Sequence, residues 1–452
     1  MPTDDISADD TSTGDNTSTG DTSTTDNTSA DDTSTGDDTS TGDDISTTDD
    51  IATSVAPRSL RCPNCNTIIQ DRWRCVCGSP LRFADPPVPT AGTPPDEIVD
   101  TAATDGLWAF SSLLAVGDDP ADRVTLGEGF TPLVDADAAD KRTTDRSSAG
   151  VDAASWNAAF KLEYVFPTGS FKDRGATTTL TRARELGVTR VVEDSSGNAG
   201  AAIATYAARA GIDAEIYVPA AVKDAKLRAI RRAGAEPVRV AGSRRDVTDA
   251  CLSALDTEDS ADASQTGSTD AWYASHAWNP AFFEGTATFA YEVAAQRGWE
   301  APDAVVTPLG HGTLFLGAYW GFCRLERAGW IETIPRLFGA QAAGVAPIVR
   351  SIHGPDAADP TGETNVAADG IQIAEPVRKR AICAAIDATD GDAIAVTEPA
   401  TARELDRLHA AGFYTEPTCA VAPAALRQLR DHGDIDPGAD VVVPLTGSGL
   451  KG

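Results

Sequence analysis

Lysine is scarce in this sequence. Only seven of its 37 basic residues are lysines, against 68 acidic residues, and the formal net charge is -31. The acidity is not confined to one segment, because residues 51–452 still hold 53 acidic against 37 basic side chains. Nucleic-acid binding needs a basic surface, so this charge argues against a nucleic-acid partner. An acidic surface poor in lysine suits a protein kept soluble at high salt, where charge repulsion is screened, and we expect a halophilic source.

The sequence also lacks a long hydrophobic run. Although 41% of its residues are hydrophobic, no apolar stretch approaches the roughly 18–20 residues that a membrane-spanning helix needs. Its beginning has no basic segment followed by an apolar one, so nothing indicates export. We therefore expect a cytoplasmic protein with no membrane partner. A length of 452 residues allows more than one domain and a large core.

Residues 1–54 have few apolar side chains and much charge of one sign. The motif Thr-Ser-Thr-Gly-Asp occurs four times in this segment, starting at Thr11, Thr17, Thr33 and Thr39. Such a segment cannot bury enough apolar surface to offset the entropy lost on ordering. The composition therefore predicts a disordered acidic tail rich in threonine, serine and aspartate.

Half of the eight cysteines lie close together. Cys62 and Cys65 form one pair, with two residues between them, and Cys75 and Cys77 form a tighter pair, with one. Four thiolates on two turns match a tetrahedral structural zinc site. The spacing predicts a zinc-ribbon-like module over residues 58–83, and thiols in a ribbon that has lost its metal are the alternative.

From residue 159 onward, short apolar runs alternate with helical patterns. The predicted strands are Ala159–Tyr164, Arg190–Glu193, Ala214–Val218, Pro237–Val240, Trp272–Ser275, Ala304–Pro308, Arg336–Gln341, Ala393–Val396 and Val441–Leu445. This alternation predicts an α/β fold, with helices on both faces of mostly parallel sheets. Functional sites in such folds lie at the carboxyl ends of the strands. Before this part, residues 84–105 are rich in proline, threonine and aspartate and are predicted to form a linker.

One lysine stands at a predicted strand-to-helix junction. Lys172 lies in Pro167–Gly175, whose sequence is Pro-Thr-Gly-Ser-Phe-Lys-Asp-Arg-Gly, between the strand Ala159–Tyr164 and a helical segment that starts at Ala176. A lysine after a turn of small residues is well placed to bind an aldehyde as a Schiff base. The alternative is a capped helix start with a surface lysine.

A second loop, Asp194–Gly200, follows the predicted strand Arg190–Glu193 and opens an alanine-rich helix. Its hydroxyl groups and exposed backbone N–H groups at a helix N-terminus can bind a carboxylate. The residues concerned are Ser195, Ser196 and Gly197. An ordinary N-cap formed by Ser196 or Asn198 is the alternative.

A third loop follows the predicted strand Ala304–Pro308 and again opens a helix. It contains Gly310, His311, Gly312, Thr313 and Leu314. The two glycines let backbone amides approach an anion, and the helix dipole favours a phosphate. The loop is not a P-loop, because the Gly-Lys-Ser/Thr ending is absent. For His311 itself, a loop histidine without a role is the favoured interpretation.

A fourth loop closes the chain. Thr446 follows the apolar strand Val441–Leu445, and its hydroxyl could meet a ring nitrogen; a frayed terminus is the alternative. Together the four loops offer a reactive lysine, a carboxylate site, a phosphate site and a hydroxyl group. An enzyme that binds pyridoxal 5′-phosphate and an amino-acid substrate needs this set of groups.

With these motifs, residues 58–452 resemble the fold-type II pyridoxal-phosphate enzymes, and among them most of all the threonine synthases. Pro167–Gly175 is highly specific for that group. Further matches are Gly127-Glu128-Gly129, Thr131-Pro132-Leu133, Ser196-Gly197-Asn198, Asn279-Pro280, Glu284-Gly285, Glu416-Pro417 and Leu445-Thr446-Gly447. Many archaeal members carry a Cys-x-x-Cys…Cys-x-Cys-Gly ribbon, as at Cys62–Gly78 here.

The resemblance implies a fold like that of the tryptophan synthase β subunit, with two doubly wound parallel-sheet domains. A large cofactor-binding domain would span residues 106–189 and 291–452, and a small α/β domain would span 190–290. The zinc-ribbon-like module and the disordered tail would precede them. A homodimer suits this fold.

The resemblance also implies roles around the cofactor ring. Lys172 would bind the cofactor aldehyde and then carry protons, with Phe171 beside it. Asn198 would hydrogen-bond the ring hydroxyl, and Thr446 would face the pyridine nitrogen. The loop Ser195–Gly197 would hold the substrate carboxylate, and the loop Gly310–Leu314 would surround the cofactor phosphate.

The implied reaction converts O-phospho-L-homoserine and water into L-threonine and phosphate. Three departures from the family pattern bear on the substrate rather than on the cofactor. Gly-His-Gly-Thr-Leu at 310–314 replaces Gly-Asn-x-Gly-Asn, Glu-Gly-Thr-Ala-Thr at 284–288 lacks the usual lysine, and Phe166 replaces an asparagine. The alternatives are a β-eliminating or β-replacing relative, such as a threonine/serine dehydratase or a cysteate-synthase-like enzyme, and a non-catalytic zinc-ribbon binding protein.

Overall fold

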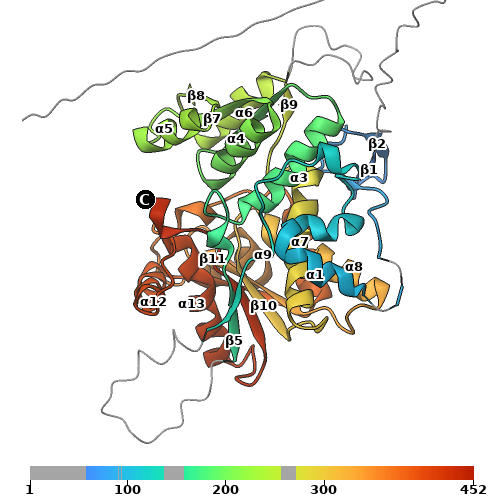
Figure 1. Cartoon of the computed structure of the whole chain (residues 1–452). Coiled ribbons are helices and arrows are strands. Elements are labelled where there is room, and N and C mark those ends of the chain that lie inside the picture. Colours follow the sequence, from blue (N-terminus) through green and yellow to red (C-terminus); the bar gives the residue numbers. More distant parts are fainter. Residues whose placement is uncertain (1–57, 90, 93, 137–156, 256–270, 452) are drawn as a thin grey trace, which may run out of the picture. The chain divides into compact units, whose positions relative to one another are not determined.

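Two sheets form the framework of the chain (Figure 1). The computed structural model describes residues 58–89, 91–92, 94–136, 157–255 and 271–451. The predicted acidic tail over 1–54 lies outside these residues. The larger sheet has six strands in the order β12-β11-β10-β13-β5-β4, and the smaller has four in the order β8-β7-β6-β9. In these two sheets all neighbouring strands are parallel except β4 and β5.

Each of the nine predicted strands overlaps a strand of these sheets. The larger sheet consists of β4 (Leu133–Asp135), β5 (Ala158–Lys161), β10 (Ala304–Pro308), β11 (Arg336–Ala342), β12 (Asp392–Val396) and β13 (Val441–Pro444). The smaller consists of β6 (Arg190–Glu193), β7 (Asp213–Pro219), β8 (Glu236–Val240) and β9 (Trp272–Tyr273). Apolar runs form parallel strands here because helices cover both faces of such sheets, so side chains on both faces are buried.

A fully buried helix lies at the centre of the helical layer. The helices are α1 (Asp96–Asp105), α3 (Lys172–Glu185), α4 (Asn198–Ala210), α5 (Asp224–Arg232), α6 (Arg244–Ser253), α7 (Pro280–Gln296), α8 (Thr313–Ala328), α9 (Pro347–His353), α10 (Pro355–Ala358), α11 (Lys379–Ala388), α12 (Glu398–Ala410) and α13 (Pro417–His432). Every residue of α7 from Pro280 to Ala295 is buried, because α3 and α8 pack against it. A Cβ atom on Gly317 of α8 would lie 2.1 Å from the Thr286 side chain, so glycine is needed for this close packing.

The predicted linker over 84–105 is wrong in its second half. Residues Asp96–Asp105 form α1, which starts after Pro95 and carries Asp96 and Glu97 in its first turn. Ile98 and Ala102 are four residues apart, share one face and are buried. Two apolar residues in a polar segment were too weak a pattern to predict the helix.

The strand predicted over Ala159–Tyr164 ends earlier than expected. On one side its neighbour β13 ends at Pro444, which pairs with Lys161. On the other side only the Leu162 N–H continues the pairing, by donating to the Pro132 carbonyl at 2.9 Å. A 3-10 turn follows at Glu163–Val165, and Glu163 is buried. This turn directs the chain toward the loop that contains Lys172.

The four clustered cysteines lie in the loops that connect the strands of a third, antiparallel sheet. Its strands are β1 (Ser59–Arg61), β2 (Ile68–Gln70) and β3 (Arg82–Phe83), in the order β2-β1-β3. Leu60 and Phe83 of this sheet join the main hydrophobic core, and Asp71 forms an ion pair of 2.7 Å with Arg182 of α3. The cysteine-bearing segment is therefore packed onto α3 and the main hydrophobic core.

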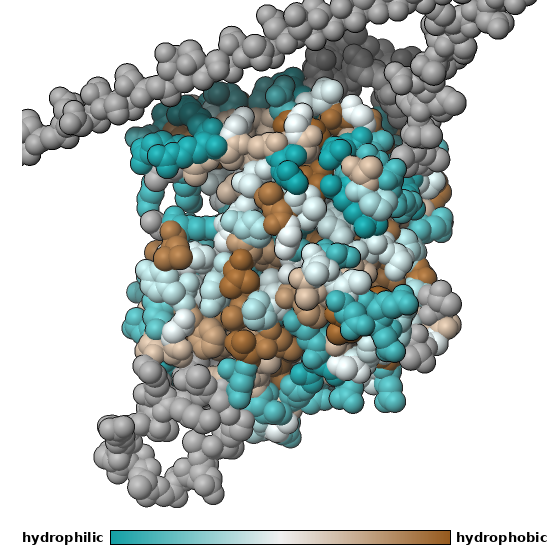
Figure 2. Space-filling model, in the orientation of Figure 1, coloured by the Kyte–Doolittle hydropathy of each residue, from teal (hydrophilic) through white to brown (hydrophobic). Residues whose placement is uncertain are grey.

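Hydrophilic residues dominate the face shown in Figure 2, and hydrophobic residues gather toward its centre. No helix in the described ranges is both long and apolar enough to cross a membrane.

Candidate active site

Three loops meet at the carboxyl ends of neighbouring strands. Strands β10, β13 and β5 are adjacent and parallel, so the chain leaves them at the same edge of the sheet. The backbone N–H of Phe171 donates to the carbonyl of Thr446 at 3.1 Å. The Nζ atom of Lys172 donates to the Thr313 hydroxyl at 3.3 Å. The structure thus brings the predicted lysine, phosphate and hydroxyl loops together.

The motif Pro167–Gly175 folds back on itself. The Asp173 carboxylate accepts hydrogen bonds from the Thr168 backbone N–H, at 2.8 Å, and from the Thr168 hydroxyl. Two residues later, a Cβ atom on Gly175 would lie 2.1 Å from the Phe282 ring, so only glycine fits there. These contacts fix the start of α3, and Lys172 is its first residue.

A buried ionic network anchors the same helix. Arg174 contacts Glu163 at 2.6 Å and Glu292 at 2.6 Å, and Lys161 contacts Glu292 at 2.8 Å. All four side chains are fully buried, and their two positive and two negative charges balance. Burial alone would raise the pKa of Glu292, but the charges of Arg174 and Lys161 lower it to about 2. Glu292 therefore remains ionised in the interior.

Burial shifts the Lys172 amine toward its neutral form. Desolvation lowers the pKa of Lys172 to about 8, although the carboxyl groups of Glu193 and Glu416 act in the opposite direction. The neutral amine is the nucleophile that attacks an aldehyde, and a lowered pKa makes more of it available near neutral pH.

The N-terminus of α8 has the features of a phosphate site. Gly312 adopts a φ of 77° at the N-cap position, and no side chain caps the helix. A Cβ atom on Gly312 would lie 2.6 Å from Ile382, so the loop requires glycine. Among the described residues, the buried atoms Thr307 Oγ1 and His311 Nδ1 have no hydrogen-bond partner. Uncapped N–H groups and unpartnered polar atoms beside Lys172 fit a phosphorylated cofactor such as pyridoxal phosphate. Thr313 and Leu314 are buried behind this loop.

Asn198 and Thr446 have protein partners. The Asn198 side-chain amide donates to Glu416 at 3.1 and 3.3 Å, and its oxygen accepts from Lys451 at 3.0 Å. The Thr446 hydroxyl lies 3.4 Å from Cys419 Sγ. Burial raises the pKa of Glu416. Asn198 is thereby linked to the closing loop of the chain, because the Glu416 N–H donates to the carbonyl of Gly447 at 3.0 Å.

The predicted carboxylate-binding loop lies at the carboxyl end of β6, an inner strand of the smaller sheet. Ser195, Ser196 and Gly197 follow β6 and precede α4, whose N-terminus has no side-chain cap. The Gly197 N–H donates to the Ser195 hydroxyl at 3.3 Å. Within the described ranges, no hydrogen bond joins these three residues to Lys172, Thr313 or Thr446.

Two titratable side chains near Lys172 were not predicted from the sequence. Glu193 is the last residue of β6, and its carboxylate lies 2.7 Å from His276 Nδ1. The ring of His276 lies 5.2 Å from that of His311, measured between centroids. The position of Glu193 at the carboxyl end of a predicted strand was the only signal in the sequence.

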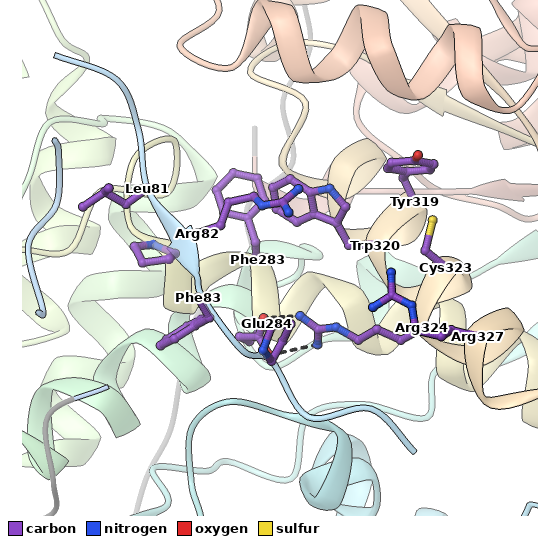
Figure 3. A pocket seen from close by; sticks show the side chains of 12 residues that line it. Leu81, Arg82, Phe83, Phe283, Glu284, Tyr319, Trp320, Cys323, Arg324 and Arg327 are labelled. Carbon is purple, nitrogen blue, oxygen red and sulfur yellow. Dashed lines mark hydrogen bonds and ion pairs between the residues drawn. The ribbon is translucent and has the colours of Figure 1, made fainter. Parts of the chain in front are cut away.

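A separate cavity of about 290 Å³ lies between β3, with the residues on either side of it, and helices α7 and α8 (Figure 3). None of the predicted site residues lines it. Glu284 and Arg324 face each other at its floor, 2.5 Å apart, and Glu284 also accepts from the Ala115 N–H at 2.9 Å. Glu284 therefore holds α7 and α8 together, whereas Gly285 lets α7 pack closely against α3.

The four predicted metal ligands converge. The sulfur atoms of Cys62, Cys65, Cys75 and Cys77 all lie within 4.8 Å of one another. Cys62 lies 3.6 Å from Cys77, and Cys65 lies 3.4 Å from Cys75. Four converging thiols are a donor set that suits a tetrahedral metal ion.

Comparison with known sequences agrees with this site. The sequence profile described as pyridoxal-phosphate dependent enzyme matches residues 124–447. The chain belongs to this family of enzymes, and pyridoxal phosphate is its cofactor.

Within that family, the chain belongs with the threonine synthases. A threonine synthase from Methanosarcina acetivorans is 33% identical over 350 residues, which cover 76% of this chain and 80% of the relative. One from Methanocaldococcus jannaschii is 30% identical over 406 residues, which cover 87% of this chain and 92% of the relative. The predicted family and the predicted class, a pyridoxal-phosphate-dependent lyase, are confirmed.

Solved structures share the fold. An L-serine ammonia-lyase from Rhizomucor miehei matches with a TM-score of 0.55 and 19% identity, over 70% of this chain and 93% of its own. The processed form of threonine deaminase isoform 2 from Solanum lycopersicum matches with a TM-score of 0.55 and 19% identity, over 80% and 88%. At this identity the likeness concerns the fold alone, and it confirms the predicted fold class. The predicted domain boundaries stay predictions.

Proposed function

We propose that this enzyme is a threonine synthase, which converts O-phospho-L-homoserine and water into L-threonine and phosphate. One observation carries the proposal: Lys172 lies against Thr313 at an uncapped helix N-terminus, in a chain related to threonine synthases along most of its length. The lysine would bind the cofactor aldehyde, and the helix N-terminus would bind the cofactor phosphate. When bound, pyridoxal phosphate supplies a sink for the electron pair left at carbon when a proton is removed.

The chain's own residues would then orient the substrate and move protons. The Lys172 amine would take a proton from the substrate Cα and return protons later. The Ser195 and Ser196 hydroxyls, with the first N–H groups of α4, would hold the substrate carboxylate. The Asp173 and Arg174 contacts would keep Lys172 in place. Low mobility of the proton carrier matters because catalysis requires reacting atoms to be held in contact.

The remaining cofactor contacts are proposed from their positions. Asn198 would bond the ring hydroxyl, which would compete with Glu416 for the Asn198 amide. Thr446 would face the ring nitrogen with a neutral hydroxyl group. A hydroxyl partner leaves that nitrogen largely unprotonated, so the ring would be a weaker electron sink. Phe171 lies beside the lysine, with Lys172 Nζ 4.3 Å from the centre of its ring.

A substrate panel tests the proposed reaction. We expect phosphate release from O-phospho-L-homoserine together with an equal amount of threonine. We expect kcat/KM for 2-oxobutyrate formation from threonine, and for pyruvate formation from serine, to be at least about tenfold lower. The reverse order would identify a dehydratase-like relative. If the protein turns over none of these substrates, and does not turn over O-phosphoserine with sulfite either, a non-catalytic protein would be favoured.

We also propose that the four clustered cysteines bind a structural zinc ion. Metal analysis of the purified protein should find about one zinc per chain. The Cys77→Ser variant should lose most of it, because three thiolates hold the ion less tightly than four. Cys323→Ser provides the control, since Cys323 lies in α8 outside the cluster. Full zinc content in Cys77→Ser, or none in the unmodified protein, would contradict the proposal.

Three further expectations remain proposals. The enzyme would work in the cytoplasm as a homodimer, and its acidic surface would favour activity at high salt. Maximal activity and solubility in dilute buffer would contradict the halophilic interpretation.

A further inference from the structure

A buried row of three titratable side chains reaches the Lys172 site from the smaller sheet. Glu193 ends β6, His276 follows β9, and His311 lies in the loop before α8. Glu193 is fully buried and His276 is 6% exposed. The Glu193 carboxyl group lies 2.7 Å from His276 Nδ1, and the rings of His276 and His311 meet edge to face at 80°.

Two polar atoms of this row are buried without a partner. Among the described residues, neither Glu193 Oε2 nor His311 Nδ1 has a hydrogen-bond partner. Leaving a buried polar atom unpaired costs about 1–3 kcal/mol, so such an atom calls for a partner such as a ligand, a water molecule or an ion. The row is therefore built to meet a bound molecule rather than only to fill the core.

The environment keeps the row neutral. Burial raises the pKa of Glu193 well above its usual value, and the nearby Asp194 carboxylate acts in the same direction. Burial, with the positive charges of Lys172 and Arg244, lowers the pKa of His276 well below its usual value. A protonated Glu193 that donates to Nδ1 leaves the ring proton of His276 on Nε2. His276 then presents a neutral N–H donor.

The acidic neighbour of Glu193 is already neutralised. The Asp194 carboxylate accepts from the Tyr273 hydroxyl at 2.9 Å and from the Thr248 hydroxyl at 2.6 Å, and it lies 3.3 Å from Arg244. With Asp194 paired and Glu193 protonated, this side of the site does not repel an anion. A substrate phosphate can therefore approach the row.

We propose that His276 is the acid that protonates the leaving phosphate, with Glu193 as the positioning residue behind it and His311 as a second hydrogen-bonding group. This inference rests on the proposed threonine synthase reaction. That reaction expels a phosphate from Cγ, and Lys172 is engaged with protons on carbon, so a second proton-carrying group is needed.

The step balances. Lys172 takes a proton from Cβ, and the electron pair of that C–H bond forms the Cβ=Cγ double bond as the Cγ–O bond breaks. The electron pair of the Cγ–O bond stays on the phosphate oxygen, which takes the proton from His276 Nε2. Nδ1 takes the proton of Glu193, which becomes a carboxylate. Lys172 returns its proton to Cγ, and the water molecule that adds at Cβ releases one proton to solvent. When the products leave, His276 Nε2 regains a proton from solvent and Nδ1 returns its proton to Glu193.

The test compares two substrates. Loss of phosphate from O-phospho-L-homoserine creates a Cβ=Cγ double bond, so 2-amino-3-butenoate enters the reaction after the leaving group has gone. We expect His276→Asn to lower kcat/KM for O-phospho-L-homoserine by about 10²-fold or more. For 2-amino-3-butenoate we expect a change of less than about threefold. Glu193→Gln should show the same selectivity with a smaller loss, because glutamine still bonds the imidazole but cannot pass on a proton.

His353→Asn is the matched control. His353 also contacts a carboxylate, Asp392 at 2.6 Å, but it is 40% exposed and lies outside the site. Its kinetics should match those of the unmodified enzyme. Cofactor content and the absorbance of the bound cofactor should be unchanged in all three variants, which tests for misfolding.

Each outcome either supports or overturns the proposed role of His276 and Glu193. Equal losses on both substrates, or no loss on either, in folded His276→Asn and Glu193→Gln would overturn the role of the pair. If the unmodified enzyme releases no phosphate from O-phospho-L-homoserine, the proposed function itself fails, and this inference fails with it. The two failures are distinguished by the unmodified enzyme alone.

Discussion

Replacing Lys172 with alanine is expected to lower turnover of O-phospho-L-homoserine by at least about 10³-fold. The substitution removes the only amine that contacts Thr313 at the start of α8 in the described chain. Without it, neither the covalent link to the cofactor nor the proton transfers at carbon can occur. Phosphate release measured under saturating substrate and added pyridoxal phosphate provides the readout.

Lys226→Ala is the control for this loss. Lys226 is an exposed lysine in α5, so its removal changes the charge by the same amount without touching the site. It should leave turnover unchanged. Substantial turnover in Lys172→Ala, with unchanged folding, would show that another group carries the chemistry.

Replacing Arg174 with methionine is expected to lower the free energy of unfolding by about 3–5 kcal/mol. The substitution leaves Glu163 and Glu292 buried with Lys161 as their only remaining cationic partner among the described residues. An uncompensated buried charge costs far more than the loss of a surface ion pair. Urea unfolding monitored by tryptophan fluorescence gives the measurement.

Arg239→Met is the comparison for Arg174→Met. Arg239 also pairs with a carboxylate, Asp224, but the two side chains are 47% and 77% exposed. We expect a change of no more than about 1 kcal/mol there. If Arg174→Met does not accumulate as folded protein, Glu163→Gln removes one carboxylate and allows the same comparison. Equal, small effects at the buried and exposed sites would refute the assigned importance of the network.

The framework could be predicted from the sequence because its signals are local. Strands such as Ala304–Pro308 are short apolar runs bounded by turns, and β10 occupies the predicted residues. The helix Asp96–Asp105 was missed because its apolar face consists of little more than Ile98 and Ala102. Pattern recognition fails where a short helix is stabilised by packing rather than by its own sequence.

The site could be predicted only loop by loop. Lys172 stands in a motif that is distinctive by itself. The pairing of Glu193 with His276 depends on β6 and β9 being neighbours, with Val191 beside Trp272. That pairing joins segments some eighty residues apart, and the sequence around each residue gives no indication of it. The predicted roles of Asn198, Thr446 and the loops at 195–197 and 310–314 stay predictions.

The buried ionic network has a consequence for a protein with this surface charge. At 0.1 M salt, ions in solution largely screen interactions between exposed charges that are more than about 10 Å apart, but they screen buried pairs much less. Arg174, Glu163, Glu292 and Lys161 are fully buried. Salt can therefore alter the solubility of the protein through its exposed acidic groups, while the electrostatic interactions that hold α3 stay almost constant. Lys172, the first residue of α3, is thus insulated from changes in the ionic strength of the solution.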